Sequence, residues 1–281
     1  MQRALHYGVD TVISSLWRFE PFPIAATFVA VLFYTFGTGP LRGRFFPGQP
    51  YPTAKATLFY LSMTLLTLIF VSPLHTLGEV FLLSAHMLTM MLVIFVVAPL
   101  FLLSLPGWLI APVALHPVIK PVLRFLTRPV VNVLHFNGAF LLIHIPLLLK
   151  TLMFSTDALH YLTYFAIFGS AVLMFWPVMN PLPGALPSPP YRVQLTYLVV
   201  LLVTHNPFSS VFSFAPGLIY PWYEGAPRVF GLSPLQDQQF AGVVMGVMYI
   251  TVMLVAVAAV FVRWFGGRAE ERSVRLEAAH D

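Results

Sequence analysis

One short segment of the sequence, SAHMLTMM, combines side chains that bind soft metal ions. His86 and Met90 are four residues apart and would lie on one face of a helix, with Met87 and Met91 beside them. Imidazole and thioether groups together suit Cu(I), a soft ion. Methionine is also an ordinary apolar residue of helix cores, so the spacing alone leaves a packing role open. The pattern makes this segment a candidate copper site.

Further polar side chains lie in other apolar stretches of the chain. Ionisable groups inside a membrane usually face the interior of a helix bundle and mark a functional path. Each could instead make a structural hydrogen bond between helices. As metal ligands we nominate His86, Met90, His144, His160, Met87 and Met245, and as a supporting polar cluster His205, Asp237, Gln238 and Gln239.

Apolar segments of membrane length dominate the chain. Of the 281 residues, 58% are hydrophobic and 9% are charged, whereas a soluble domain carries about 25% charged residues. Connections rich in proline and glycine separate the apolar segments, as in NPLPGALPSPP. We therefore predict an all-α integral membrane protein, a single domain of seven transmembrane helices. The predicted spans are about 21–37, 55–74, 79–105, 130–154, 157–180, 192–214 and 239–264.

The basic residues predict how the chain is oriented in a cell (plasma) membrane. Cytoplasmic loops are enriched in Lys and Arg, and eleven of the fifteen such residues fall in alternate loops and the C-terminal tail. We place the N-terminus outside and the C-terminus in the cytoplasm, with 265–281 as a short cytoplasmic tail. The proline-interrupted segment 106–129 is expected to lie along the membrane interface. The basic residues would contact anionic lipid, and they lack the interleaved aromatic residues of a nucleic-acid surface.

With this orientation, four histidines from four helices share the outer half of the membrane. At about 1.5 Å per helical residue, His86, His144 and His205 lie about seven to ten residues below the outer ends of their spans. His160 lies just inside the start of its span. The cluster at one depth is a stronger indication of function than any single histidine.

The last span has an unusually polar entry, SPLQDQQFAGVVM. Asp237 is expected to cap this helix, because a carboxylate is favoured at the positive end of a helix dipole. Gln238 and Gln239 carry amides that need hydrogen-bond partners if they are buried. The polar entry therefore predicts contacts with neighbouring elements.

The sequence contains no pattern for enzyme chemistry. It has no G-x-S-x-G, P-loop or HExxH motif and no paired carboxylates within a span. It also has no cysteine, which excludes disulfides and thiolate metal sites. Any metal must therefore bind through His, Met, carboxylate or backbone groups, and we do not expect an enzyme.

The motifs together resemble the polytopic CtaG family of cytochrome c oxidase assembly proteins. The similarity runs from about Val71 to Val262, through SPLHTLGEVFLLSAHM, VAPLFLLSLP, HIP, MFWPVMNPLP, IYPWYEG and GLSPLQDQQFAGVVM. It implies a role in maturation of the oxidase, with copper supplied to its buried catalytic site. The family's functional positions fall on His86, His144, His160, Asp237, Gln238, Gln239, Gly242 and Met245.

The chain departs from this family pattern at several positions. A second histidine is expected where the chain has Met90, and a tryptophan where it has Ile143. The pattern His-x-x-Glu-His becomes HYLTY, from His160 to Tyr164. Met90 keeps a soft ligand, so a Cu(I) site could persist with altered affinity, or the site could have decayed and left a scaffold role.

Our leading hypothesis is a membrane-embedded assembly factor that binds Cu(I) transiently in the outer half of its bundle. Its expected partners are oxidase subunits or assembly intermediates, and a periplasmic copper donor. A b-type haem electron carrier is one alternative, because histidines that face each other from two helices can ligate haem. A structural scaffold subunit with a decayed metal site is the other.

Overall fold

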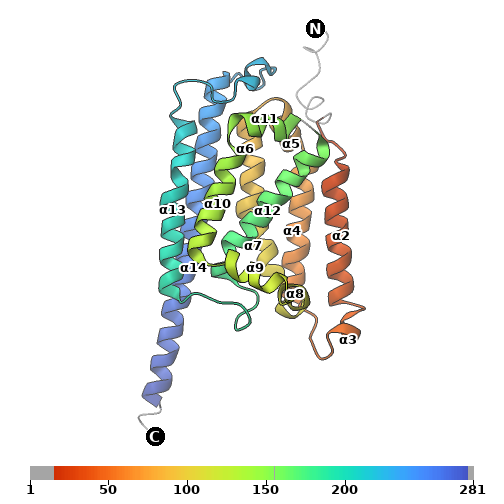
Figure 1. The fold of residues 1–281 in the computed structure, drawn as a ribbon, viewed down its shortest axis with the longest axis vertical. Coiled ribbons are helices and arrows are strands. Elements are labelled where there is room, and N and C mark those ends of the chain that lie inside the picture. Colours follow the sequence, from red (N-terminus) through yellow and green to blue (C-terminus); the bar gives the residue numbers. More distant parts are fainter. Residues whose placement is uncertain (1–15, 155, 278–281) are drawn as a thin grey trace.

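A computed structural model of the chain describes residues 16–154 and 156–277, with side chains described for 16–152 and 156–266. Over these residues the fold is a bundle of helices without a β-strand (Figure 1). Six helical segments are long and apolar enough to cross a membrane, or up to eight if each of two bent pairs is one span. The chain is therefore a multi-pass membrane protein.

Five of the long helices are unbroken in the backbone, and the sixth contains a π-helical segment. The five are α2 (Pro21–Thr38), α4 (Thr53–Val71), α12 (Asp157–Met179), α13 (Tyr191–Ser213) and α14 (Pro234–Glu277). The sixth runs through α6 (Leu83–Leu92), η2 (Val93–Val97) and α7 (Ala98–Ser104). Pro99 explains the irregular turn, because proline cannot donate to the preceding turn and its ring clashes there.

The predicted fourth span, 130–154, is not one continuous helix. It divides into α10 (Pro129–Ile143) and α11 (Pro146–Phe154), which are bent by 78°. Pro146 causes the break, because it disfavours helical backbone at Ile145 and removes an N–H donor. Figure 1 shows α10 beside the long helices and α11 lying across one end of the bundle. Counting the α10–α11 pair as one span adds one to the six long segments.

Shorter helices lie at the two ends of the bundle. The segment 106–129 contains α8 (Gly107–Ala114) and α9 (Ile119–Leu126), bent by 110°. The remaining short elements are α3 (Arg42–Phe45), α5 (Pro73–Val80) and the 3-10 helix η3 (Pro221–Gly225). We call the two ends of the bundle the α8–α9 end and the α5–α11 end (Figure 1).

The predicted third span starts too early, at residue 79. The chain instead forms α5 up to Val80, passes through extended backbone at Leu82, and begins α6 at Leu83. Pro73 follows Ser72 at the start of α5, a position where the missing N–H of proline costs nothing. A separate short helix therefore lies beside the start of α6.

The α6–α7 segment lies in the core, and α2 lies at the edge of the bundle. In an apolar stretch of 18 residues within Leu83–Ser104, 61% is buried, against 22% in Pro21–Thr38. Helix α14 packs along α13 and also contacts α6, while α7 contacts α4 and α12. Side chains on α6 are therefore surrounded by other helices.

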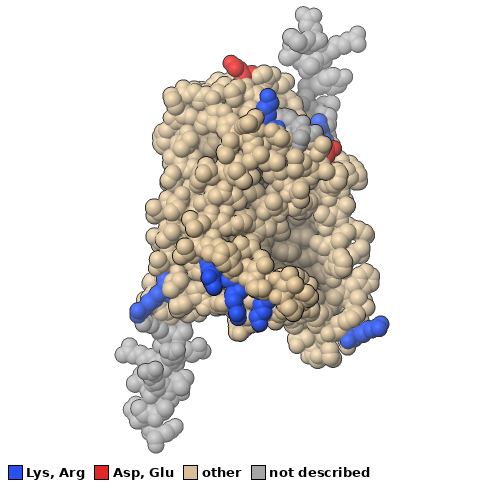
Figure 2. All heavy atoms as spheres, viewed as in Figure 1, with Lys and Arg blue, Asp and Glu red and all other residues tan. Residues whose placement is uncertain are grey.

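Charged side chains are distributed unevenly along the bundle axis. On the face drawn in Figure 2, most of the visible Lys and Arg lie at the α8–α9 end, while the visible acidic side chains lie at the opposite end together with a few basic ones. Beyond the bundle, α14 continues as helix to Glu277, so most of the predicted tail 265–281 is helical. Residues 278–281 lie outside the described part of the chain.

Candidate metal centre

Helix α5 brings two side chains of types that can bind a metal to the α5–α11 end of the bundle. His75 and Glu79 are four residues apart, so one face of α5 carries both. Gly78 lets this helix approach α6 closely, because a Cβ there would lie 2.6 Å from the backbone N of His86. The hydroxyl of Tyr223 donates to Gly78 O at 2.9 Å, which ties the same turn of α5 to η3.

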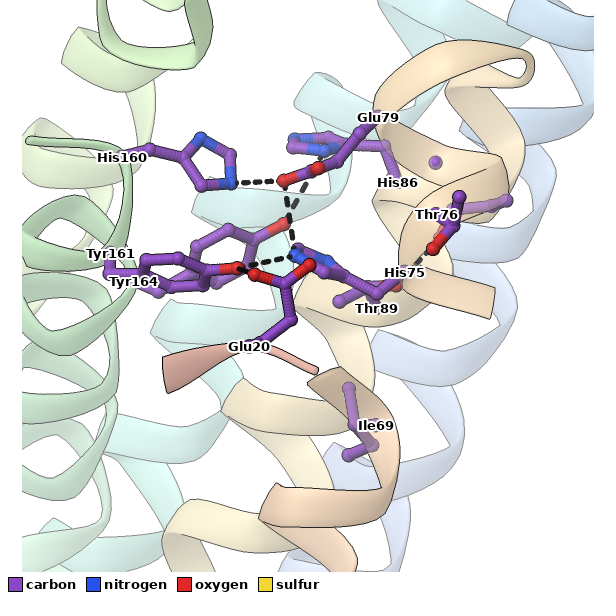
Figure 3. A network of polar contacts seen from close by, with 12 residues as sticks. Glu20, Ile69, His75, Thr76, Glu79, His86, Thr89, His160, Tyr161 and Tyr164 are labelled. Atoms are coloured by element: carbon purple, nitrogen blue, oxygen red, sulfur yellow. Dashed lines mark hydrogen bonds and ion pairs between the residues drawn. The ribbon is translucent and has the colours of Figure 1, made fainter. Parts of the chain in front are cut away.

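Three side chains converge between α5 and α12, and we call them the triad: His75, Glu79 and His160. Glu79 Oε1 lies 3.0 Å from His75 Nε2 and 2.6 Å from His160 Nε2. One donor atom from each residue lies within 4.8 Å of the other two. In Figure 3 the two imidazole rings approach the carboxylate from different helices. Two imidazoles and a carboxylate form a donor set that can hold a metal ion.

The surroundings of the triad keep Glu79 ionised. Burial opposes the charge of this carboxylate, but hydrogen bonds and electrostatic attraction from His160 and His75 outweigh it and hold the pKa of Glu79 well below its ordinary value. Beside the triad, the Tyr161 hydroxyl donates to Glu20 Oε2 at 2.5 Å and lies 3.4 Å from His75 Nε2. The triad therefore lies in a connected polar network (Figure 3).

A small cavity lies next to the triad, and we call it the His86 cavity. Its volume is about 20 Å³, enough for one water molecule or one ion. Three of the nominated metal ligands, His86, Met90 and His160, lie in its wall. The complete lining is His86, Met90, Ile143, Leu149, Leu152, His160, Thr163 and Tyr164. The structure thus brings together an imidazole and a thioether from α6 with an imidazole from α12.

The His86 side chain has one ring nitrogen near a partner and one without. Nδ1 lies 3.4 Å from the hydroxyl of Tyr164. Nε2 is buried and has no hydrogen-bond partner among the described residues. A proton on Nδ1, donated to Tyr164, would leave the lone pair of Nε2 available to a metal ion.

The size of the His86 cavity favours a single ion over a haem group. Binding sites for molecules of drug or cofactor size measure about 300–1,000 Å³. A larger cavity of about 770 Å³ does exist, lined in part by Lys55, Arg192 and Arg263. Its lining contains no histidine, so it does not belong to the metal centre.

Three other nominated ligands, and His205 of the supporting polar cluster, lie outside the lining of the His86 cavity. Met87 and Met245 are buried in the hydrophobic core and do not line the cavity. His144 follows the last residue of α10, with its ring stacked on Phe140 at 4.1 Å and Nδ1 at 2.7 Å from Phe140 O. His205 contacts Asn137 Oδ1 through Nδ1 at 3.0 Å. The structure does not bring these four side chains into the cavity wall.

The prediction that Asp237 caps the last span is wrong. Helix α14 begins earlier, at Pro234, and Ser233 caps it by accepting from Gln236 N at 3.2 Å, while Gln236 Oε1 accepts from Ser233 N at 2.9 Å. The Asp237 carboxylate instead caps α6, where Leu83 N donates to it at 2.7 Å and both the N–H and the hydroxyl of Ser84 donate to it. Asp237 thus fixes the start of the helix that carries His86.

The two glutamines at this helix entry do find partners. Gln238 Oε1 accepts from Ile219 N at 2.7 Å, and its Nε2 donates to Gly217 O at 3.0 Å. Gln239 Nε2 donates to Ala215 O at 3.1 Å. These bonds tie the connection between α13 and α14 to the start of α14. The polar entry to the last span is therefore explained by contacts within the protein.

Sequence reasoning missed His75 and Glu79, two of the three triad residues. His75 falls in the connection between the predicted spans 55–74 and 79–105, and Glu79 is the first residue of the predicted third span, so no local pattern marked either as a ligand. The available signal was a proline at position 73 followed by a histidine and a glutamate at helical spacing. These features are typical of a short helix with a polar face.

The fold and the site define a class: a multi-pass helical membrane protein with side chains that could hold a metal ion gathered at one end of its bundle. The sequence profile of the cytochrome c oxidase caa3 assembly factor family (CtaG) matches residues 32–266. The chain belongs to this family. Searches of curated proteins and of solved structures found no match.

Proposed function

We propose that this protein assists the delivery of copper to cytochrome c oxidase by holding one Cu(I) ion in the His86 cavity. The observation that carries the proposal is the unpartnered, buried Nε2 of His86 in a cavity that also contains Met90 and His160. Leaving a buried polar atom without a partner costs about 1–3 kcal/mol. Ligation of an ion would offset that cost.

The donor set suits an ion that must later be released. A thioether and imidazoles accept soft Cu(I), and three such ligands leave a position open for a donor or acceptor protein. The Met90 thioether replaces the histidine of the family pattern with a softer ligand. A transient carrier needs this combination of selectivity and weak binding.

The place of the cavity in the fold supports exchange on the outer side of the membrane. Most of the basic side chains visible in Figure 2 lie at the α8–α9 end, and cytoplasmic ends of membrane proteins are enriched in such residues. We therefore assign the α8–α9 end to the cytoplasm and the α5–α11 end, with the His86 cavity, to the outside of the plasma membrane. A periplasmic copper donor and oxidase assembly intermediates are the partners that this arrangement favours. The role is one of transfer rather than catalysis.

Complementation of a deletion strain tests the proposal. Cells that lack the protein would receive wild type, the His86→Ala, Met90→Leu double variant, or the control His116→Ala, whose exposed side chain lies between α8 and α9. The copper content of purified oxidase is then measured. Copper restored by wild type and the control but not by the double variant would support delivery. Equal restoration by all three would establish the scaffold role instead.

A further inference from the structure

The triad differs from the His86 cavity in the kind of ion that it suits. Its donor atoms are Nε2 of His75, Oε1 of Glu79 and Nε2 of His160, and no thioether is among them. Carboxylate oxygen is a hard ligand, while imidazole accepts Zn²⁺ and Cu²⁺ as well as Cu(I). The combination favours a divalent ion over Cu(I).

The spacing of the triad is close to that of a metal site. With metal–ligand bonds of about 2.0–2.2 Å, two ligand atoms in a tetrahedral site are about 3.3 Å apart. Two of the three separations are 3.0 and 2.6 Å, and the third is at most 4.8 Å. An ion between the donors therefore requires the two imidazoles to approach each other by no more than about 1.5 Å.

The charge around the triad also matches a divalent ion. The Glu79 carboxylate lies within the triad, and the Glu20 carboxylate joins the same network through the Tyr161 hydroxyl. Two carboxylates balance the charge of a dication, which a buried site requires. The Glu79 side chain is 23% exposed while that of His75 is 1% exposed, so an ion can enter past Glu79.

His160 belongs to both donor sets, because it also lines the His86 cavity. A neutral imidazole carries a proton on one nitrogen and a lone pair on the other, so it ligates one ion at a time. An ion in the triad therefore removes His160 from the cavity. The two donor sets cannot both be complete in one molecule.

We propose that His75, Glu79 and His160 form a second metal site for a divalent ion of the Zn²⁺ class, and that its occupation excludes Cu(I) from a complete site in the His86 cavity. Zn²⁺ binding by the triad is independent of the proposed copper function. The competition rests on that function. Divalent metal would then regulate how much copper the protein carries.

Zn²⁺ titration of the detergent-purified full chain, followed by calorimetry, tests the site. Wild type is compared with Glu79→Gln, which keeps the shape of the side chain but removes its charge, and with Glu224→Gln, which changes an exposed carboxylate on η3. We expect one Zn²⁺ per chain in wild type and Glu224→Gln. Zn²⁺ affinity should fall by about tenfold or more in Glu79→Gln, since even outer-shell changes have effects of that size. Equal affinity in wild type and Glu79→Gln would overturn the site.

A second measurement tests the competition and separates it from the copper proposal. Wild type and Glu79→Gln are loaded with Cu(I) under anaerobic conditions, with and without one equivalent of Zn²⁺. We expect Zn²⁺ to weaken Cu(I) binding to wild type by about tenfold or more and to leave Glu79→Gln unchanged. Simultaneous full binding of both ions would overturn the competition. Zn²⁺ binding without any Cu(I) binding would support the triad and contradict the proposed function. Gel filtration and circular dichroism confirm that each variant is folded.

Discussion

Nδ1 of His86 lies 3.4 Å from the hydroxyl of Tyr164. Tyr164 is one of the residues at which the chain departs from the family pattern, which has a histidine there. In the proposed copper site, this tyrosine would orient the imidazole rather than bind the ion itself. A ring nitrogen held in this way leaves the opposite nitrogen free as a ligand. The departure at position 164 is therefore compatible with a working metal site.

Replacing this tyrosine tests its orienting role. Tyr164→Phe removes the hydroxyl and keeps the ring, so we expect Cu(I) affinity to fall by about tenfold, the effect of losing an outer-shell partner. Competition with a chromogenic Cu(I) chelator measures the change. The control is Tyr191→Phe, which alters an exposed tyrosine at the start of α13. An unchanged affinity in Tyr164→Phe would show that the hydroxyl does not orient His86.

The structure gives His86 and His144 different surroundings, and this makes a distinct prediction. His144 stacks on Phe140 and does not line the His86 cavity. We therefore expect His144→Ala to lower thermal stability, because it removes the stacking on Phe140 and the contact with its carbonyl oxygen. Cu(I) affinity should stay within about threefold of wild type, because the lining of the cavity is unchanged. The same chelator titration and a melting curve check both effects. A loss of copper binding as large as that of His86→Ala would return His144 to the ligand set.

Gly78 controls the approach of α5 to α6. A Cβ at this position would lie 2.6 Å from His86 N and 2.7 Å from its Cα, so Gly78→Ala must push the two helices apart. We expect lower thermal stability together with weaker Zn²⁺ binding by the triad. The matched control is Gly169→Ala in α12, where a Cβ meets nothing within 4 Å. That change should be neutral or stabilise by up to about 1 kcal/mol. Identical behaviour of the two variants would contradict the close contact.

Asp237 lies in α14 but is expected to stabilise the protein by capping the start of α6. Asp237→Ala leaves the first N–H groups of α6 without their acceptor, which costs about 1–3 kcal/mol for buried groups. Thermal melting in detergent measures the loss. Asp157→Ala, at the exposed first turn of α12, serves as the comparison and should cost less. A smaller loss of thermal stability in Asp237→Ala than in Asp157→Ala would rule out that Asp237 stabilises the protein by capping α6.

The apolar pattern predicted most of the long helices because membrane length and composition are local properties of the sequence. The ends of α2 and α12 fall within a residue or so of their predicted positions. The break at Ile145 was missed, although Pro146 marks it, because the residues on both sides are apolar. Length alone did not separate a bent pair from a straight span.

The candidate site was only partly predictable, because its members meet through tertiary packing. Spacing grouped His86 with Met90, and these two residues of one helix do line the same cavity. No local pattern links Glu79 to His160, which come from different helices. Depth counting also placed His144 and His205 near the site, but depth does not say which way a side chain points. The Asp237 carboxylate illustrates the same limit, since it caps α6 rather than α14.

The central claim is that one Cu(I) ion binds in the His86 cavity. Anaerobic titration of the purified protein against a Cu(I) chelator tests it most directly, with wild type, the His86→Ala, Met90→Leu double variant and the His116→Ala control measured side by side. We predict one Cu(I) per chain for wild type and the control, and an affinity lower by about tenfold or more in the double variant. No Cu(I) binding by wild type, or equal binding by all three proteins, would contradict the claim.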